Sequence, residues 1–403
     1  MIGKAGVIEL DGRPWRASEN TPMARPRAAL ARVEIITDLA AAEAPWRALE
    51  RDGALTPYQH FDWISAWQRH VGAARGITPL IVLGVSETGE PLFLLPLGKW
   101  RVGPITVAGF LGGKHANFNF GPWRRDGAPA GAIETVLARL KAAAPEIDVL
   151  ALLNQPERWE GLANPFATLR GQPSPSFGYR FTLGGRSYVE IVASQLGRDS
   201  RRTLRKKETR LKQLPGYRYA RARTRAEVDR YFHAFFAQKA GRLAEQGIDN
   251  SLGSPDVKSF LREACHHGLA HGHPTIELHA LESDDEVLAV FGCINDGRRF
   301  CSMFNSYTLG EHARQSPGLI LMLHVIKDCT ERGASIFDLG VGEARYKTHF
   351  CDEPEPLFDL FLAMSVPGRL VAPALMLAGR LKRWAKRTSL LMRLAARLRR
   401  IAR

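Results

Sequence analysis

Cysteine is scarce in this chain, and the few cysteines present exclude two classes of protein. Among 403 residues there are five, an odd number, and no two of them form a CxxC pair. A disulfide-rich secreted domain needs an even and densely spaced set, and most structural zinc sites need closely paired ligands. The cysteines are therefore expected to be reduced, mostly buried thiols, and the protein is expected to be cytoplasmic.

Long hydrophobic runs are also missing. The first twenty residues contain no apolar h-region, so no secretory signal peptide is expected. The best candidate for a membrane span, residues 79–98, is interrupted by "SETGE". Hydrophobic residues (45%) and charged residues (24%) are present in ordinary amounts, which predicts a globular protein, and the length predicts two domains.

Acidic residues are absent from the C-terminal end. Residues 369–403 contain eleven Lys and Arg and no Asp or Glu, so subtracting these eleven from the net charge of +15 leaves +4 for the first 368 residues. A net charge this small over the first 368 residues argues against nucleic-acid binding by the whole fold. No specific nucleic-acid partner is therefore expected.

The basic tail has a helical hydrophobic pattern. Its apolar residues lie three or four positions apart, or at multiples of that spacing, at positions 377, 381, 384, 391, 394, 398 and 401. This predicts an amphipathic helix of the kind that lies on anionic membranes, which would make the protein peripheral to the inner face of a membrane. Docking of the tail on the body of the protein and binding to another acidic partner are the alternatives.

Four segments can be distinguished along the chain. Residues 1–32 are rich in Pro, Arg and Ala, show no periodicity and are expected to be a disordered leader. The stretch "NPFATLRGQPSPSFGY", residues 164–179, contains three prolines and separates two halves, 33–178 and 179–365. The basic tail, 366–403, is the last segment.

Each half is predicted to contain helices, then an antiparallel meander, then a further helix and strand. In the second half the meander occupies 275–282, 287–295 and 299–307, and "PLFDLFLAM", residues 356–364, is its last strand. The halves resemble each other loosely, which suggests a duplication. The simplest architecture is an α+β fold with mixed, largely antiparallel sheets flanked by helices.

A strand, a loop and a helix start follow one another in the second half. Ser316 suits the N-cap of this helix, Pro317 suits its first position, and Gly318 allows a close backbone approach. With Gln315 and Leu319 they would form a phosphate cradle, because free N–H groups and the positive end of the helix dipole would face the ligand. A buried helix that binds nothing is the alternative.

This order resembles the coenzyme A site of GNAT-fold acyltransferases, whose signature is Q/R-x-x-G-x-G/A. Gln315 and Gly318 match the signature, and Ile320 departs from its last position. The stretches "SRRTLRKKETRLKQL", "QSPGLILMLHVI" and "FDLGVGEARYKTHF", with "FLGGKHANFNFGP" in the first half, resemble the CelD-type acetyltransferases, a GNAT-like family of cellulose and exopolysaccharide biosynthesis. The resemblance covers residues 33–365.

The resemblance has implications for fold and activity. It implies tandem GNAT-like domains, related to those of the FemAB peptidyltransferases. It also implies transfer of an acyl group, such as acetyl, from acyl-CoA to an amine or hydroxyl of a sugar or similar acceptor. Acetyl-CoA or another acyl-CoA would be the donor, without a metal.

The strand that follows the cradle ends in a cluster of polar residues. If neighbouring parallel strands separate there, Asp338 and the loop after it face the reacting centre. Asp338 or Glu343 is then a candidate general base, Tyr346 a candidate acid for the leaving thiolate, and Lys347 a candidate partner for an acidic group or phosphate. The alternatives are a turn cap for Asp338, a solvated acid for Glu343, a core aromatic for Tyr346 and an exposed charge for Lys347.

Basic residues elsewhere are candidates for substrate binding. The helix that begins near Ser200 carries seven Lys and Arg, Arg205 among them, and can hold an anionic acceptor or the 3′-phosphate of the coenzyme. Lys239 and Arg242 lie three apart on an otherwise apolar helix and are candidate acceptor contacts. The histidines of "CHHGLAHGHPT" lack a second ligand cluster, so no metal site is predicted.

Three functions therefore stay open. The first is a GNAT-like acyltransferase of polysaccharide or cell-envelope biosynthesis, which the polar cluster at 338–347 favours. The second is a non-catalytic protein that binds a membrane or polysaccharide machinery. The third is a FemAB-like aminoacyl transferase that uses aminoacyl-tRNA as the donor.

Overall fold

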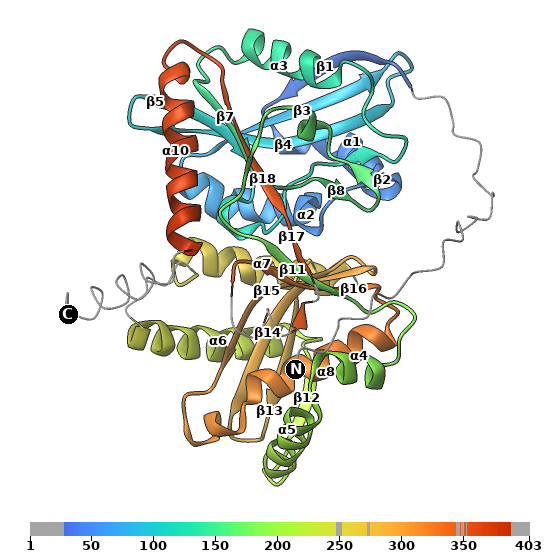
Figure 1. Cartoon of the computed structure of the whole chain (residues 1–403), viewed down its shortest axis with the longest axis vertical. Coiled ribbons are helices and arrows are strands. Elements are labelled where there is room, and N and C mark those ends of the chain that lie inside the picture. The colour runs from blue at the N-terminus through green and yellow to red at the C-terminus, as the bar shows by residue number, and fades with distance from the viewer. Residues whose placement is uncertain are drawn as a thin grey trace, which may run out of the picture.

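Two sheets, each with its own helices, form the two halves of the molecule (Figure 1). The computed structural model describes residues 28–246, 252–271, 275–343, 347, 350–351 and 353–387. The first sheet has the order β1-β3-β4-β5-β7-β18-β10, with the short strands β2 and β6 attached. Its strands are β1 Leu30–Ile36, β2 Gly53–Ala54, β3 Thr78–Ser86, β4 Pro91–Val102, β5 Ile105–Phe110, β6 Trp123–Arg124, β7 Val149–Pro156, β10 Gln172–Pro173 and β18 Leu357–Ala363.

The second sheet has the order β12-β13-β14-β15-β16-β11-β17, and β15 and β16 form its parallel pair. Its strands are β11 Gly178–Thr182, β12 Arg218–Arg221, β13 Glu277–Glu282, β14 Val287–Asn295, β15 Arg299–Tyr307, β16 Ile336–Val341 and β17 Glu353–Glu355. A separate hairpin consists of β8 Arg158–Trp159 and β9 Leu162–Ala163. The predicted α+β fold with mixed, largely antiparallel sheets is confirmed.

Helices cover both sheets. They are α1 Leu39–Asp52, α2 Phe61–Trp67, α3 Ala132–Ala143, α4 Tyr188–Gln195, α5 Arg198–Leu211, α6 Arg225–Gln246, α7 Pro255–His271, α8 Pro317–Glu331 and α10 Gly368–Arg387. Short helical turns lie at η1 Pro57–Gln59, η2 Gln68–Gly72, η3 Gly113–His115, η4 Pro165–Thr168 and η5 Glu311–Gln315. Helix α8 packs on β13, β14 and β15, whereas α6 packs on the same strands from the opposite face.

The last strand was predicted in the second sheet, and this prediction is wrong. Strand β18 returns to the first half, pairs antiparallel with β7 and also with β10, and is followed by α10 (Figure 1). Both faces of the strand are covered, because Leu357 and Leu360 join the main core while Phe361 and Ala363 pack near α10. A strand that is apolar on both faces carries no sign in its sequence of which sheet it joins.

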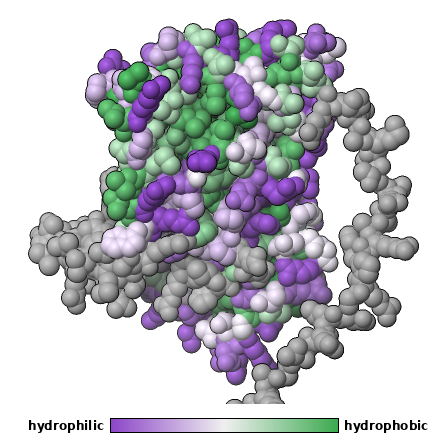
Figure 2. Space-filling view, turned by 45° about the horizontal axis from the view of Figure 1, so that its top comes forward, coloured by the Kyte–Doolittle hydropathy of each residue, from purple (hydrophilic) through white to green (hydrophobic). Residues whose placement is uncertain are grey.

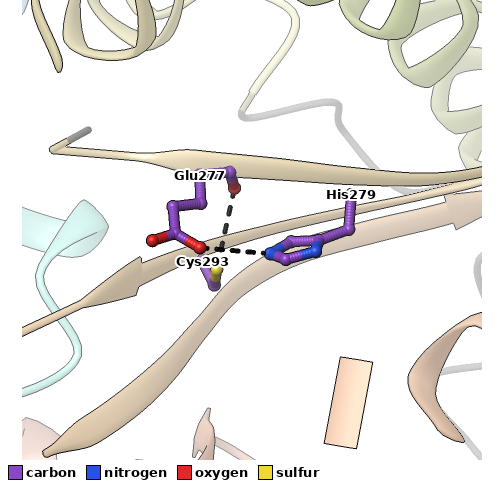
Figure 3. Close-up of side chains that lie close together, drawn as sticks. All are labelled: Glu277, His279 and Cys293. Carbon is purple, nitrogen blue, oxygen red and sulfur yellow. Dashed lines mark hydrogen bonds and ion pairs between the residues drawn. The ribbon is translucent and has the colours of Figure 1, made fainter. Parts of the chain in front are cut away.

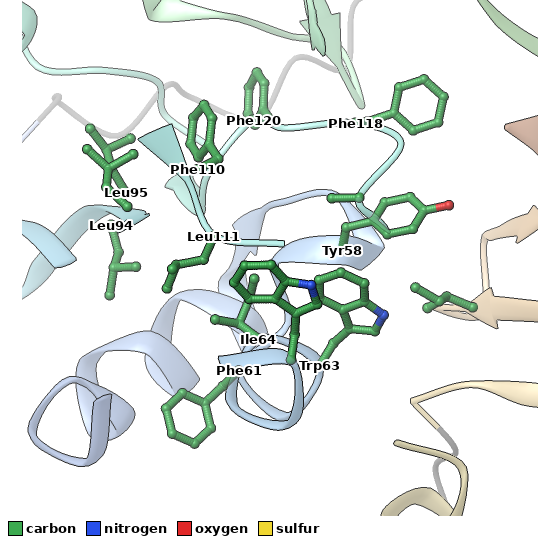
Figure 4. Packing of buried hydrophobic residues seen from close by; sticks show 14 of the residues in the cluster. Tyr58, Phe61, Trp63, Ile64, Leu94, Leu95, Phe110, Leu111, Phe118 and Phe120 are labelled. Carbon is green, nitrogen blue, oxygen red and sulfur yellow. The ribbon is translucent and has the colours of Figure 1, made fainter. Parts of the chain in front are cut away.

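A continuous aromatic core connects the two halves. Trp63 on α2 packs edge-to-face on Phe260 of α7, with ring centroids 5.1 Å apart. Figure 4 shows Trp63 beside Tyr58 in the cluster that also contains Phe118 and Phe120. The loop that carries these phenylalanines is rich in glycine and asparagine, and Phe118 and Phe120 are fully buried. The first domain therefore contributes a packed loop to the boundary between the halves.

Candidate functional site

The parallel strands β15 and β16 separate after three residue pairs. Arg299, Phe300 and Cys301 pair with Ile336, Phe337 and Asp338, and β15 then continues to Tyr307 paired with β14 but not with β16. The Ile336 N–H donates to the Arg298 carbonyl at 3.1 Å. The two-residue repeat of a parallel ladder would bring the Asp338 N–H to the Phe300 carbonyl and then the Gly340 N–H to the Ser302 carbonyl. The strands therefore open at Ser302 and Gly340, as the sequence had suggested for this region.

Both groups that the ladder leaves unpaired are capped by side chains. The Gly340 N–H donates to Oδ1 of Asp338 at 2.6 Å, and Nδ2 of Asn117 donates to the Ser302 carbonyl at 3.1 Å. Gly340 has φ +77°, and a Cβ there would meet Nδ2 of Asn117 at 2.7 Å, so both the conformation and the close approach favour glycine. Asn117 belongs to the first domain, so that domain reaches the point where the strands open.

The loop that presents Asn117 is held by buried polar groups. Nε2 of Gln59 donates to the Phe118 carbonyl at 3.2 Å and to Oδ1 of Asn119 at 3.0 Å, and Oγ1 of Thr56 donates to the same carbonyl. Nδ2 of Asn117 also donates to the Tyr58 hydroxyl at 2.6 Å. Buried hydrogen bonds of this kind fix side-chain positions, because breaking them leaves unsatisfied polar groups.

A cavity of about 320 Å³ lies at the start of α8, next to the C-terminal end of β15. Its lining includes three of the five predicted cradle residues, together with the predicted substrate residue on α6: Ser316, Gly318, Leu319 and Arg242. The other lining residues are Phe291, Asn305, Tyr307, Ala313 and Met322. The Arg242 guanidinium lies 4.9 Å from the centre of the Tyr307 ring, which adds positive charge at this position.

Ser316 is the N-cap residue of α8, but its side chain does not cap the helix. Its backbone is left-handed, with φ 57° and ψ 48°. The hydroxyl accepts a hydrogen bond from Nζ of Lys207 on α5 at 2.8 Å. The N–H of Gly318 has no partner available within the helix, because it lies in the first turn. This helix start therefore combines an unsatisfied N–H, the helix dipole and a lysine.

The remaining two predicted cradle residues, Gln315 and Pro317, are buried beneath this turn. Pro317 is buried at the first helical position, where its missing N–H costs nothing. Gln315 is 7% exposed, and its Oε1 has no hydrogen-bond partner among the described residues. A Cβ on Gly318 would lie 3.0 Å from the Tyr307 ring, so glycine is also the residue that packs best there.

Asp338 is fully buried and engaged by both carboxylate oxygens. Oδ1 accepts from Gly340, and Oδ2 accepts from Nε and Nη2 of Arg299 at 2.8 and 2.5 Å. Arg299 also donates to Glu355 at 2.7 Å and lies 4.1 Å from the Trp159 ring centre. Burial raises the pKa of Asp338, although Arg299 opposes the shift. The turn-cap alternative matches this geometry, and a general-base role for Asp338 stays a prediction.

The other polar residues of the cluster have different surroundings. Lys347 is buried, donates from Nζ to the Val341 carbonyl at 3.2 Å, and has its pKa lowered by burial to about 8. Glu343 is exposed. The pKa of Tyr179 is raised mainly by burial of the phenol, and the negative charge of Glu343 adds to this shift. The predicted acid Tyr346 lies outside the described residues.

The two other predicted substrate residues lie apart from the cavity lining. Lys239 is half-buried on α6, and burial together with Arg242 lowers its pKa. Arg205 is exposed and lines a groove on α5 with other basic side chains, namely Arg198, Arg201, Arg202 and Lys206. On α5 it is Lys207, and not Arg205, that bonds a residue of the cavity lining, Ser316.

A buried cluster of Glu277, His279 and Cys293 has the residue types of a metal site (Figure 3). However, Arg332 donates to both carboxylate oxygens of Glu277 at 2.7 Å, and the Tyr219 hydroxyl lies 2.8 Å from Nδ1 of His279. Nε2 of His279 faces the Glu277 carboxylate at 3.4 Å. The arginine neutralises the carboxylate, so an ion-pair network accounts for this cluster without a metal.

Sequence reasoning missed Asn117, Tyr58, Arg299 and Lys207 as site residues. Lys207 was noted only as one of several basic residues on α5, and Asn117 only as part of a glycine- and asparagine-rich stretch. Their roles depend on contacts with residues far away in the sequence, which no local pattern records.

Comparison with known proteins agrees with this geometry. Residues 198–348 match the family model described as an acetyltransferase (GNAT) domain. This segment is similar to that family. The comparison with curated proteins gives no match.

Solved structures extend the likeness to both halves. FemX superposes with a TM-score of 0.55 at 11% identity, over 82% of this chain and 97% of that chain. A conserved protein of unknown function from Bacteroides thetaiotaomicron gives a TM-score of 0.50 at 11% identity, over 82% of this chain and 99% of that chain. At these identities the likeness concerns the fold alone. The chain thus has the predicted tandem GNAT fold, and the segment that matches the family model contains the five predicted cradle residues.

Proposed function

We propose that the protein is an acyltransferase that moves an acyl group from acyl-CoA to an amine or hydroxyl acceptor. The observation that supports this best is the position of the cavity. It lies at the start of α8, beside the C-terminal end of β15, beyond the three residue pairs that join β15 to β16. Calorimetric titration with acetyl-CoA is the direct test.

The residues at the start of α8 fit the pyrophosphate of a coenzyme A thioester. The helix dipole and the Gly318 N–H favour an anion, and Lys207 and Arg242 add two positive charges. No acidic residue lines this cavity among those described. Tyr307, Leu319 and Met322 provide apolar surface for the less polar part of the donor.

In the proposed reaction, the acceptor nitrogen or oxygen attacks the thioester carbonyl and the bond to sulfur breaks. Glu343, which is exposed beyond the end of β16, is the proposed base for the acceptor proton. Tyr346 is proposed to protonate the leaving thiolate. Lys347, with its pKa of about 8, is proposed to hold an acidic group of the acceptor. Asp338 is assigned a positioning role, because both of its oxygens are occupied.

The acceptor class follows from the CelD-type resemblance, which suggests a sugar in polysaccharide or cell-envelope biosynthesis. The FemAB-like alternative would use the same fold with aminoacyl-tRNA as the donor. The cavity at the start of α8 favours the coenzyme, because it offers a small anion site beside an apolar lining. The opening between β15 and β16 favours an acyltransferase over a non-catalytic protein, because a non-catalytic protein does not need this opening to hold an acyl group.

We further propose that α10 contacts an anionic membrane surface. Ala372, Val371 and Leu375 pack the helix on the first sheet. The opposite face bears exposed hydrophobic residues at helical spacing: Leu370 (81%), Leu377 (57%), Leu381 (56%) and Trp384 (60%). Figure 2 shows exposed hydrophobic surface on the first-domain half, on the side where α10 lies in Figure 1.

The charge of α10 selects the kind of partner. The helix carries six Lys and Arg and no Asp or Glu. Two copies of such a helix would repel each other, whereas a surface of anionic lipids attracts it and accepts its apolar side chains. None of the described helices is long and apolar enough to cross a bilayer, so the proposed contact is interfacial.

A further inference from the structure

We infer that Asn117, supplied by the first domain, closes the inner end of the acyl cleft and restricts the donor to short acyl groups. This inference rests on the proposed acyl-CoA donor and concerns the residue that sets its chain length. It assigns a role in substrate selection to a domain that contains none of the cradle residues.

The length of β15 places the thioester near Asn117. The cavity at the start of α8 includes Tyr307, and Ser302 lies five residues earlier on the same strand. At roughly 3.3 Å per residue, these two positions are about 17 Å apart. An extended pantetheine arm that begins at the cradle and follows β15 is of similar length, so the acyl group arrives beside Ser302.

The residues of the separating strands are partly exposed just outside this point and buried just inside it. Met303 on β15 and Val341 on β16, the next residues outward, are both partly exposed. On the inner side, Cys301, Asp338 and Tyr58 are fully buried. Asn117 lies at the boundary, with its amide between Ser302 and Gly340. A short acyl group can fit between Met303 and Val341, whereas a longer chain would meet the amide.

Asn117 cannot move aside without losing two hydrogen bonds. Its Nδ2 donates both to the Ser302 carbonyl at 3.1 Å and to the Tyr58 hydroxyl at 2.6 Å. Rotation of the side chain would leave the strand carbonyl unsatisfied in a buried position, which is costly. The flanking backbone is fixed as well, because Gln59 and Thr56 bond the Phe118 carbonyl. The amide is therefore a rigid end wall rather than an adaptable one.

Binding measurements test this without knowledge of the acceptor. The dissociation constants of coenzyme A, acetyl-CoA, butyryl-CoA and hexanoyl-CoA are measured by calorimetry for the wild type, Asn117→Ala and Tyr58→Phe. The wild type should bind butyryl-CoA at least about 10-fold more weakly than acetyl-CoA. Asn117→Ala should recover at least about 10-fold of that loss, because it opens the end wall. Tyr58→Phe breaks a bond to Asn117 but frees no space, so it should recover nothing.

The outcomes separate this inference from the proposed function. If the wild type binds acetyl-, butyryl- and hexanoyl-CoA equally, the inference is overturned while the acyl-CoA donor stands. If Asn117→Ala keeps the wild-type preference, Asn117 only fastens the domains. If the wild type binds neither coenzyme A nor any thioester, the proposed function fails and the inference fails with it. Should Asn117→Ala unfold, Asn117→Ser provides the same test with a smaller polar side chain.

Discussion

Arg299 and Asp338 form an enclosed ion pair at the base of the opening between β15 and β16, with Nε of Arg299 2.8 Å from Oδ2 of Asp338. The guanidinium is 8% exposed and lies over Trp159, which belongs to the first domain. The pair therefore fixes the parallel strands and joins the two halves at the same place.

Loss of this pair should destabilise the protein. Asp338→Asn should lower the free energy of unfolding by about 3–5 kcal/mol, because Arg299 would stay charged and buried without its main partner. Urea denaturation measures this value. Glu355→Gln is the control and should cost less, since Glu355 is nearer to solvent. Full stability of Asp338→Asn combined with lost turnover would instead identify Asp338 as the general base.

Lys347 should make stability depend on alkaline pH. Its pKa is about 8 in the folded state, against an ordinary value near 10.5, so the folded state releases this proton first. Between these values the unfolded state holds more protons, and stability should rise with pH by roughly 3 kcal/mol in total. Below pH 8 the free energy that the folded protein loses by burying the charged Lys347 does not change with pH.

Unfolding of the wild type and of Lys347→Met from pH 7 to pH 10.5 measures this effect. The variant should lack the rise and should be the more stable protein at pH 7. Lys327→Met, which removes an exposed lysine, controls for the change of surface charge. Parallel pH profiles for the wild type and Lys347→Met would show that Lys347 is not desolvated.

Lys207 should contribute to donor affinity through the start of α8. Because its Nζ bonds Ser316 at 2.8 Å, Lys207→Met should weaken acetyl-CoA binding about tenfold at low salt. The difference should shrink at high ionic strength, since part of it is long-range attraction. Lys206→Met is the matched control, as Lys206 points to the outer groove of α5. Equal losses in both variants would indicate general attraction by the helix.

The hydrophobic stripe of α10 should be needed for binding to anionic vesicles. Replacing Leu370, Leu377 and Leu381 by Ser should strongly reduce co-sedimentation with vesicles that contain phosphatidylglycerol, because Trp384 would be the one exposed hydrophobic residue left on this face of the described α10. Neutral vesicles should bind the wild type weakly. The control is Val189→Ser with Leu309→Ser, which removes exposed hydrophobic residues elsewhere. Unchanged sedimentation of the triple variant would contradict the membrane contact.

The sequence predicted those parts of the site that depend on local order. Ser316, Pro317 and Gly318 could be placed at a helix start because capping and the first-turn proline are local signals. The course of β18 could not be predicted, since an apolar strand fits either sheet. The partner of Asp338 lies 39 residues earlier in the chain, and Asn117 meets Ser302 across 185 residues. Contacts over such separations follow from the fold, which periodicity alone does not give.

Titration calorimetry with acetyl-CoA tests the central claim most directly, using the wild type, Gly318→Asp and Gly318→Asn. Both side chains add bulk near the Tyr307 ring, but only the aspartate places a negative charge against the pyrophosphate. The account predicts that the wild type binds, that Gly318→Asn binds more weakly, and that Gly318→Asp does not bind. Absence of binding to the wild type, or equal binding by all three proteins, would contradict an acyl-CoA site at the start of α8.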